Sequence, residues 1–342
     1  SATAAATPAE LGKRIADAVI AWGANDGFAL ESYPQFYNSA VNPNMAIPLQ
    51  VLGDNSLLQP NMPLGNGIPA TTNPNFWQPL ALSVFVDQFG NVFPGGVQTY
   101  VGVQALATTP FSLTRTDPLK PWLDPFGGPS RLSVPGAESP TDNQYKQQAL
   151  GVIRASSQLN DDAEEDRIDI SPAHTGNHPL GADTGTGHTT NPVTGGNYTP
   201  HLVKRGDFVR VLAEFWADGP NSETPPGHWH VLANQVADDP DLVKKIRGVG
   251  PTLGDLEWDV KTYLALSGAT HDAACAAWAL KRYYSGTRPI TMIRYMGSKG
   301  QSSEPLGPSY HPQGLPLEPG VVEVITTETA APGERHNQIW NV

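Results

Sequence analysis

Apolar residues recur at helical spacing near the start of the chain and again near its middle. The first predicted helix runs from Pro8 to Gly23, since Thr7 can cap it and proline suits a first helical turn. A second helix is predicted over 142–158. The apolar side of the first helix consists of Leu11, Ile15, Val19 and Ile20, and that of the second consists of Tyr145, Ala149, Val152 and Ile153.

The last third of the chain carries the densest helical pattern. Residues 202–217 have apolar residues at helical spacing, and 227–236 forms a further predicted piece. Residues 253–284 are predicted to form one or two long helices, which Gly286 ends, and a short segment over 290–296 follows. The apolar face of the first of these stretches consists of Phe208, Val211, Leu212 and Phe215. Together these patterns predict helices packed as a bundle.

Long irregular segments separate the predicted helices, because the chain contains 34 Gly and 33 Pro among its 342 residues. Within 28–140 only the apolar pieces 80–86 and 97–103 suggest strands or packed loop segments. The acidic stretch 159–167 suits a solvated turn. We interpret 172–201 as a loop, since glycine and proline argue against a helix that presents histidines to a metal. Its histidines are His174, His178, His188 and His201.

Composition and charge exclude several classes of protein. Eight Trp, ten Tyr and ten Phe are too many for a fully disordered chain, and no run of about 18 apolar residues could span a membrane. The net charge of −12 and the lack of a basic stripe exclude nucleic-acid binding. The single Cys275 excludes an internal disulfide, and its Ala-rich surroundings predict a buried small residue.

The strongest candidate for chemistry is the pattern K-x6-R-P formed by Lys281, Arg288 and Pro289. A lysine at a helix end and an arginine that opens the next segment can converge on one tetrahedral oxyanion. Lysine supplies a point charge and arginine a bidentate fork, which is the pairing that phosphate-like groups favour. The alternative interpretation is two surface charges beside a helix turn. Farther upstream, Asp218 precedes a glycine and suits a helix end.

Two segments together resemble the vanadium-dependent haloperoxidases, which share their fold and oxyanion pocket with the type-2 phosphatidic acid phosphatase (PAP2) superfamily. The segments are FWADGPNSETPPGHWH over 215–230 and HDAACAAWALKRYYSGTRPITMIR over 271–294. K-x6-R-P is that family's first vanadate-binding motif. The W-x-x-K spacing of Trp278 and Lys281 also recurs, as does an Asp after F-W-A, here Asp218.

The resemblance implies a mainly α-helical protein of the haloperoxidase/PAP2 bundle type with long Pro/Gly-rich loops. It implies that Lys281 and Arg288 are catalytic and bind the equatorial oxygens of vanadate, or of phosphate in its place. Trp278 would line the side where peroxide and halide arrive, and Asp218 would hold another oxyanion-binding arginine. The whole chain, 1–342, would be one incomplete domain. Its parts would be a helix with long loops (1–141), a helical core with the motif (142–296) and a loop-rich tail (297–342).

Two further motifs of the family follow K-x6-R-P, one with Ser-Gly-His and one with an arginine and the vanadium-binding histidine. Neither occurs in these 342 residues, so we expect a second polypeptide or a C-terminal fragment to supply them and no metal ligand from this chain. The expected activity is the oxidation of a halide or small organic acceptor by hydrogen peroxide, in a secreted or periplasmic protein. Two alternatives are an acid-phosphatase-like hydrolase and a non-catalytic secreted structural or interaction protein on the same scaffold.

Overall fold

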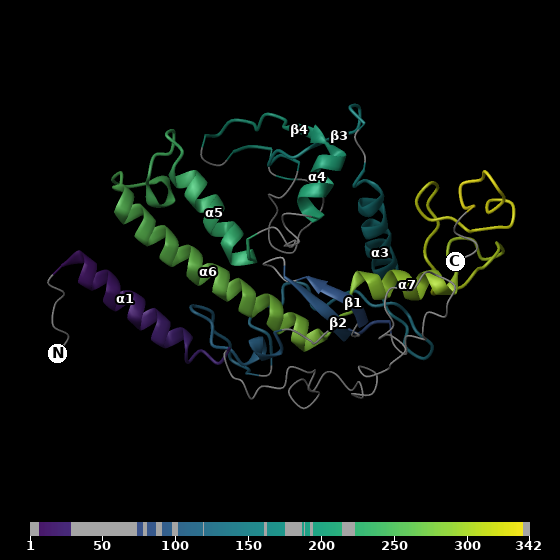
Figure 1. Cartoon of the computed structure of the whole chain (residues 1–342), viewed down its shortest axis with the longest axis horizontal. Helices are drawn as coiled ribbons and strands as arrows, with labels where there is room; N and C mark the ends of the chain where they lie inside the picture. Colours follow the sequence, from purple (N-terminus) through teal and green to yellow (C-terminus); the bar gives the residue numbers. More distant parts are fainter. Residues whose placement is uncertain are drawn as a thin grey trace. The chain divides into compact units, whose positions relative to one another are not determined.

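Helices account for most of the regular structure in a computed structural model of the chain, which confirms the predicted mainly α-helical class (Figure 1). Two units are distinguished, one from Ser1–Leu49, Thr99–Asp124 and Pro226–Ser285, the other from Gln50–Gln98, Pro125–Pro225 and Gly286–Val342. The division of the chain into domains stays a prediction. The residues that the structure describes are 7–28, 74–77, 81–86, 91–97, 102–118, 120–160, 163–174, 187, 189–191, 194–213 and 223–337.

Helix α1, Pro8–Gly23, has the bounds that the sequence predicted. The hydroxyl of Thr7 accepts a hydrogen bond from the Glu10 amide at 3.2 Å, and the Glu10 carboxylate accepts one from the Thr7 amide at 3.0 Å. This capping box satisfies two amides that the helix leaves without partners. At the other end Trp22 meets the rings of Phe111 and His271 edge-on, with centroids 5.6 and 5.1 Å away. The predicted apolar side chains Leu11, Ile15, Val19 and Ile20 are exposed.

Helix α6, Asp255–Tyr284, is the longest element of the first unit, and it is one continuous helix rather than two. Helix α5, Pro225–Ala237, lies along it (Figure 1), with the Tyr263 hydroxyl donating to the Asn234 side chain at 2.6 Å. The short 3-10 helix η1, Val103–Leu106, also packs against α6 and buries Ala105 and Leu106. A second short 3-10 turn, η3, covers Ile246–Gly248. The first unit is therefore organised around α6.

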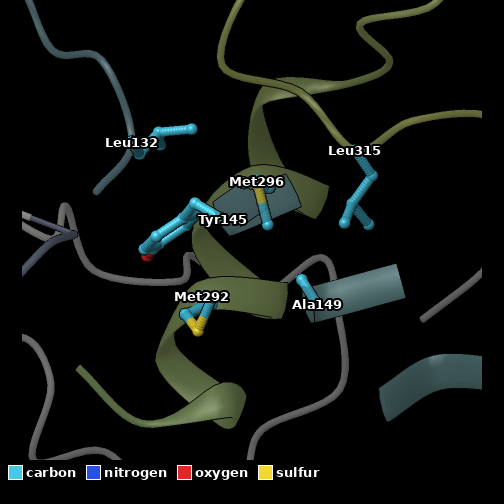
Figure 2. Close-up of a cluster of buried hydrophobic side chains, with 6 residues drawn as sticks. All are labelled: Leu132, Tyr145, Ala149, Met292, Met296 and Leu315. Carbon is cyan, nitrogen blue, oxygen red and sulfur yellow. The ribbon is translucent and has the colours of Figure 1, made fainter. Parts of the chain in front are cut away.

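The second unit has its core between helix α3, Asp142–Ser157, and helix α7, Pro289–Lys299. Figure 2 shows Tyr145 and Ala149 of α3 beside Met292 and Met296 of α7. Loop residues Leu132 and Leu315 complete this cluster. Helix α3 lies where the apolar pattern predicted a helix, although Val152 of its predicted apolar side is 40% exposed. Helix α7 covers the predicted short segment over 290–296 and extends beyond it to Lys299.

Two short sheets in the second unit correct the sequence interpretation. Strand β1, Ala81–Val86, lies within the predicted piece 80–86 and pairs antiparallel with β2, Val92–Val97. The second predicted piece, 97–103, begins only where β2 ends. Strand β3, Arg167–Asp169, pairs with β4, Leu202–Lys204. The helix predicted from residue 202 is therefore wrong at its start, since these residues are held extended by a strand 35 residues earlier.

Helix α4, Arg205–Val211, follows β4 directly and buries Gly206 and Val209. The predicted apolar face of this stretch is wrong at Val211 and Leu212, which are 49% and 44% exposed. Phe208 is half-buried, and Phe215 lies outside the described residues. The helix begins later than predicted, at Arg205.

The acidic stretch before β3 is tied to its neighbours by ion pairs. The Glu164 carboxylate lies 2.5 Å from the Lys204 ammonium and 2.7 Å from the Arg167 guanidinium, and these cations lower the pKa of the Glu164 carboxyl. Asp166 pairs with Arg205 at 2.8 Å. The described part of this stretch thus helps to join β3, β4 and α4, although exposed pairs of this kind contribute little each.

Candidate functional site

The two basic residues of K-x6-R-P lie near the end of one helix and immediately before the start of the next along the chain. Lys281 is in the last turn of α6, in the first unit, and its side chain is exposed. Arg288 is the residue before α7, in the second unit, with an extended backbone (φ −97°, ψ 152°) and an exposed side chain. Their placement at a helix end and a helix start agrees with the predicted elements, and their role stays a prediction.

Arg282, the neighbour of Lys281, is fully buried. The sequence alone did not distinguish these two cations, but their places on α6 differ, since consecutive residues on a helix point about 100° apart. Tyr283 is also buried and its hydroxyl accepts a hydrogen bond from the Lys120 ammonium at 2.5 Å. Tyr284 donates to Asp124. These contacts join the loop that contains Lys120 and Asp124 to the last turn of α6, the turn that carries Lys281. Both segments belong to the first unit.

Trp278 is half-buried one turn before Lys281. The ammonium of Lys281 lies 5.9 Å from the centroid of the indole, which is the outer range of a cation–π contact. The ring of Phe28 stacks on the indole at 6.2 Å with an interplanar angle of 20°. The structure therefore brings together two of the predicted site residues, Trp278 and Lys281.

The predicted supporting residue Asp218 lies outside the described residues, as do His178 and His188. From the same resembling segment, His228 is described and is buried in α5, with 2% exposure. No group of three or more His, Cys, Asp or Glu side chains in the described part of the chain is arranged to hold a metal ion. No helix among the described residues combines the length and apolar character that crossing a membrane requires.

Sequence reasoning missed a polar cluster in the middle of α6. The buried carboxylate of Asp272 accepts hydrogen bonds from the amides of Phe111 and Ser112 at 2.6 and 3.0 Å, and from the Ser112 hydroxyl at 2.5 Å. The neighbouring His271 ring lies 3.1 Å from the buried Asp26 carboxylate. An acidic residue inside an Ala-rich helix was the only sign of this cluster in the sequence. Its contacts indicate that it joins the segment after η1 to α6.

Cys275 lies one turn after His271, with its sulfur 3.8 Å from the ring Nδ1. It is buried, as the sequence predicted. Burial and the negative charges of Asp272 and Asp26 raise the pKa of the Cys275 thiol to about 11. Because the thiolate is the reactive form, this environment argues against a nucleophilic role.

We expect Cys275 to resist thiol reagents while the protein is folded. At pH 8 a thiol with a pKa of about 11 is thiolate to roughly one part in a thousand, and burial slows access further. The measurement is the reaction with a chromogenic disulfide reagent before and after denaturation. The signal is unambiguous, since the chain has one cysteine. Rapid reaction of the native protein would show that this thiol is accessible.

Ser285 ends α6 in a left-handed backbone conformation (φ 43°, ψ 45°), where glycine is usual. Its side chain is 1% exposed, and its hydroxyl has no hydrogen-bond partner in the described structure. Both features are unfavourable, since the left-handed region costs a non-glycine residue roughly 1–2 kcal/mol and a buried hydroxyl without a partner costs about 1–3 kcal/mol.

We therefore expect Ser285→Gly to stabilise the protein by about 1 kcal/mol, after the greater flexibility of glycine in the unfolded chain offsets part of the gain. Chemical denaturation followed by circular dichroism measures this change. Ser309→Gly is the matched control, because Ser309 also has a positive φ of 55° but is exposed. A larger gain in the free energy of unfolding for Ser309→Gly than for Ser285→Gly would show that the buried hydroxyl of Ser285 is not destabilising.

Residues 261–309 match the family described as the VCPO second helical-bundle domain. This stretch starts inside α6, includes K-x6-R-P and α7, and is a minority of the chain. The match relates it to a domain of the vanadium haloperoxidases. Neither the curated proteins nor the solved structures contain a significant match to the chain.

Proposed function

We propose that this chain contributes the first cationic motif of a vanadate-dependent haloperoxidase site. The observation that carries the proposal is the match over 261–309, since it contains both Lys281 and Arg288. In the proposed reaction, hydrogen peroxide, a halide and a proton give hypohalous acid and water. The O–O bond breaks, the halide loses two electrons and gains one peroxide oxygen, and the other oxygen leaves as water. The residue types of the motif support this assignment independently of the match.

The charge around the motif suits an oxyanion. Five basic residues and no acidic residue lie between Asp272 and Glu304, although the whole chain has a net charge of −12. Lys281 and Arg288 are both exposed, so their charges are accessible to a ligand. An ammonium and a guanidinium fit vanadate or phosphate, because both donate hydrogen bonds and neither can accept one.

Each residue would act by binding and by charge. Lys281 would donate to one oxygen of the oxyanion, and Arg288 would donate in parallel to two. When bound, vanadate would supply the site at which peroxide becomes electrophilic. The two cations would stabilise the negative charge that develops there. Trp278 would cover one side of this group and reduce the access of water.

The remaining parts of the site would come from outside these residues. We propose that a second polypeptide or a further segment supplies the acid–base histidine and the vanadium-binding histidine. The chain alone should then bind the oxyanion weakly and oxidise halide slowly or not at all. Addition of the completing polypeptide should raise both the affinity for the oxyanion and the rate of halide oxidation.

The test titrates the purified chain with orthovanadate and, separately, with inorganic phosphate, and follows binding by vanadium-51 NMR or calorimetry. Bromide oxidation with hydrogen peroxide is then measured with and without vanadate. Binding of vanadate and vanadate-dependent oxidation in the completed protein would support the proposal. Turnover of a phosphate ester without vanadate would favour the phosphatase alternative. The absence of binding to either oxyanion in the completed protein would favour the non-catalytic alternative.

A further inference from the structure

We infer that Gly102 is a positioning residue, which holds the Trp278 indole and through it the Lys281 ammonium. The relevance of this to catalysis rests on the proposed function of Lys281. Gly102 is buried at the start of η1, and its backbone has a φ of +79°. A Cβ atom at this position would lie 2.7 Å from Cε3 and 2.9 Å from Cδ2 of the indole. The ring therefore occupies the space that any other residue would fill.

The indole has further neighbours in the same unit. Phe28 stacks on it with centroids 6.2 Å apart. The Lys281 ammonium lies 5.9 Å from its centroid, three residues later on α6, at the spacing that places side chains on one helix face. Movement of the indole would thus change the surroundings of the lysine that we assign to the oxyanion.

The backbone of Gly102 cannot readily retreat, because the segment that follows it is fastened to α6. Ala105 and Leu106 are buried where η1 packs on this helix. Farther along, the Phe111 ring packs closely on Gly268 of α6. A Cβ atom on Gly268 would lie only 2.7 Å from Cδ1 of that ring. Asp272 accepts hydrogen bonds from the two amides after Pro110. These contacts hold the segment 102–112 in register with α6, with Gly102 opposite Trp278.

The experiment compares Gly102→Ala with Gly250→Ala in the full chain. Gly250 is the matched control, since it lies in the same unit with a φ of +84° and has open space where its Cβ would be. Both variants place an alanine at a positive φ, but only the first displaces the indole. The first readout is the rate of acetylation of Lys281, measured by mass spectrometry without vanadate. The second is tryptophan fluorescence, and the third is the dissociation constant for orthovanadate.

We expect Gly102→Ala to raise the Lys281 acetylation rate about two- to fivefold, the factor that corresponds to loss of an exposed cation–π contact. It should change the fluorescence and weaken orthovanadate binding, whereas Gly250→Ala should change none of these. Equal behaviour of the two variants would overturn the inference. The acetylation rate of Lys281 could change in Gly102→Ala while the parent protein binds no vanadate. That result would support the positioning role of Gly102 and contradict the proposed function.

A second variant keeps the test decisive if Gly102→Ala fails to fold. Trp278→Leu removes the indole without straining the backbone, and it should raise the acetylation rate of Lys281 by the same factor. The rate at Lys261, which lies near the other end of α6, serves as the internal reference. An unchanged Lys281 rate in Trp278→Leu would overturn the inference, because the indole would then have no influence on the lysine.

Discussion

Replacing Asp272 with alanine is expected to lower the stability of the protein by about 3–5 kcal/mol, because it leaves buried polar groups without their partner. The carboxylate accepts hydrogen bonds from two backbone amides and the hydroxyl of Ser112, and its residue is only 7% exposed. Alanine would also loosen the segment after η1 from α6. Thermal unfolding followed by circular dichroism should show an apparent melting temperature lower by roughly 10 °C.

Two comparisons isolate the carboxylate. Asp255→Ala removes an acidic residue from the same helix, but that side chain is 86% exposed and pairs only with Lys244 among the described contacts. Its melting temperature should stay close to that of the parent protein. Asp272→Asn keeps the shape of the side chain and one acceptor oxygen. Its melting temperature should therefore lie between those of Asp272→Ala and Asp255→Ala. Hydrogen exchange at the amides of Phe111 and Ser112 should accelerate in both Asp272 variants. Equal melting temperatures for Asp272→Ala and Asp255→Ala would contradict the structural role.

The helices that could be predicted from the sequence are those whose ends carry local signals. Thr7 and Glu10 form a capping box, Pro8 occupies the first helical turn, and α1 begins and ends where predicted. Helix α7 likewise follows the Arg-Pro pair that starts the predicted segment over 290–296, although it continues to Lys299. The strands were harder to predict, because pairing with a distant segment determines them. Nothing within 202–204 itself indicates that it is paired with 167–169 rather than helical.

The same distinction applies to the candidate site. The spacing of Lys281 and Arg288 is visible in the sequence, and the family match covers it. Gly102 could not be identified, because its significance depends on an indole 176 residues later in the chain. Asp272 was missed for the same reason, since its partners precede it by 160 residues or more. Local pattern thus identifies charged motifs, whereas the residues that support them are recognised only from tertiary contacts.

Replacing Arg288 with alanine is expected to weaken orthovanadate binding about 100-fold or more and to abolish vanadate-dependent halide oxidation in the completed protein. The physical reason is the loss of a bidentate, charge-assisted pair of hydrogen bonds to the oxyanion. Stability should change little, because the side chain is exposed and makes no capping hydrogen bond to α7. The backbone carbonyl of Arg288 accepts from the amides of Thr291 and Met292, and alanine retains that carbonyl.

Charge and geometry can be separated with two further variants. Arg288→Lys keeps the positive charge but loses the fork, so its affinity for orthovanadate should lie between those of Arg288→Ala and the parent protein. Lys299→Ala removes a positive charge from the end of the following helix, where the ammonium lies over the Tyr295 ring, and it should leave binding nearly unchanged. If Arg288→Ala instead lowered the melting temperature and left the vanadate affinity intact, Arg288 would be a structural residue. The proposal that K-x6-R-P binds an oxyanion would then be contradicted for Arg288, the residue assigned two of the hydrogen bonds.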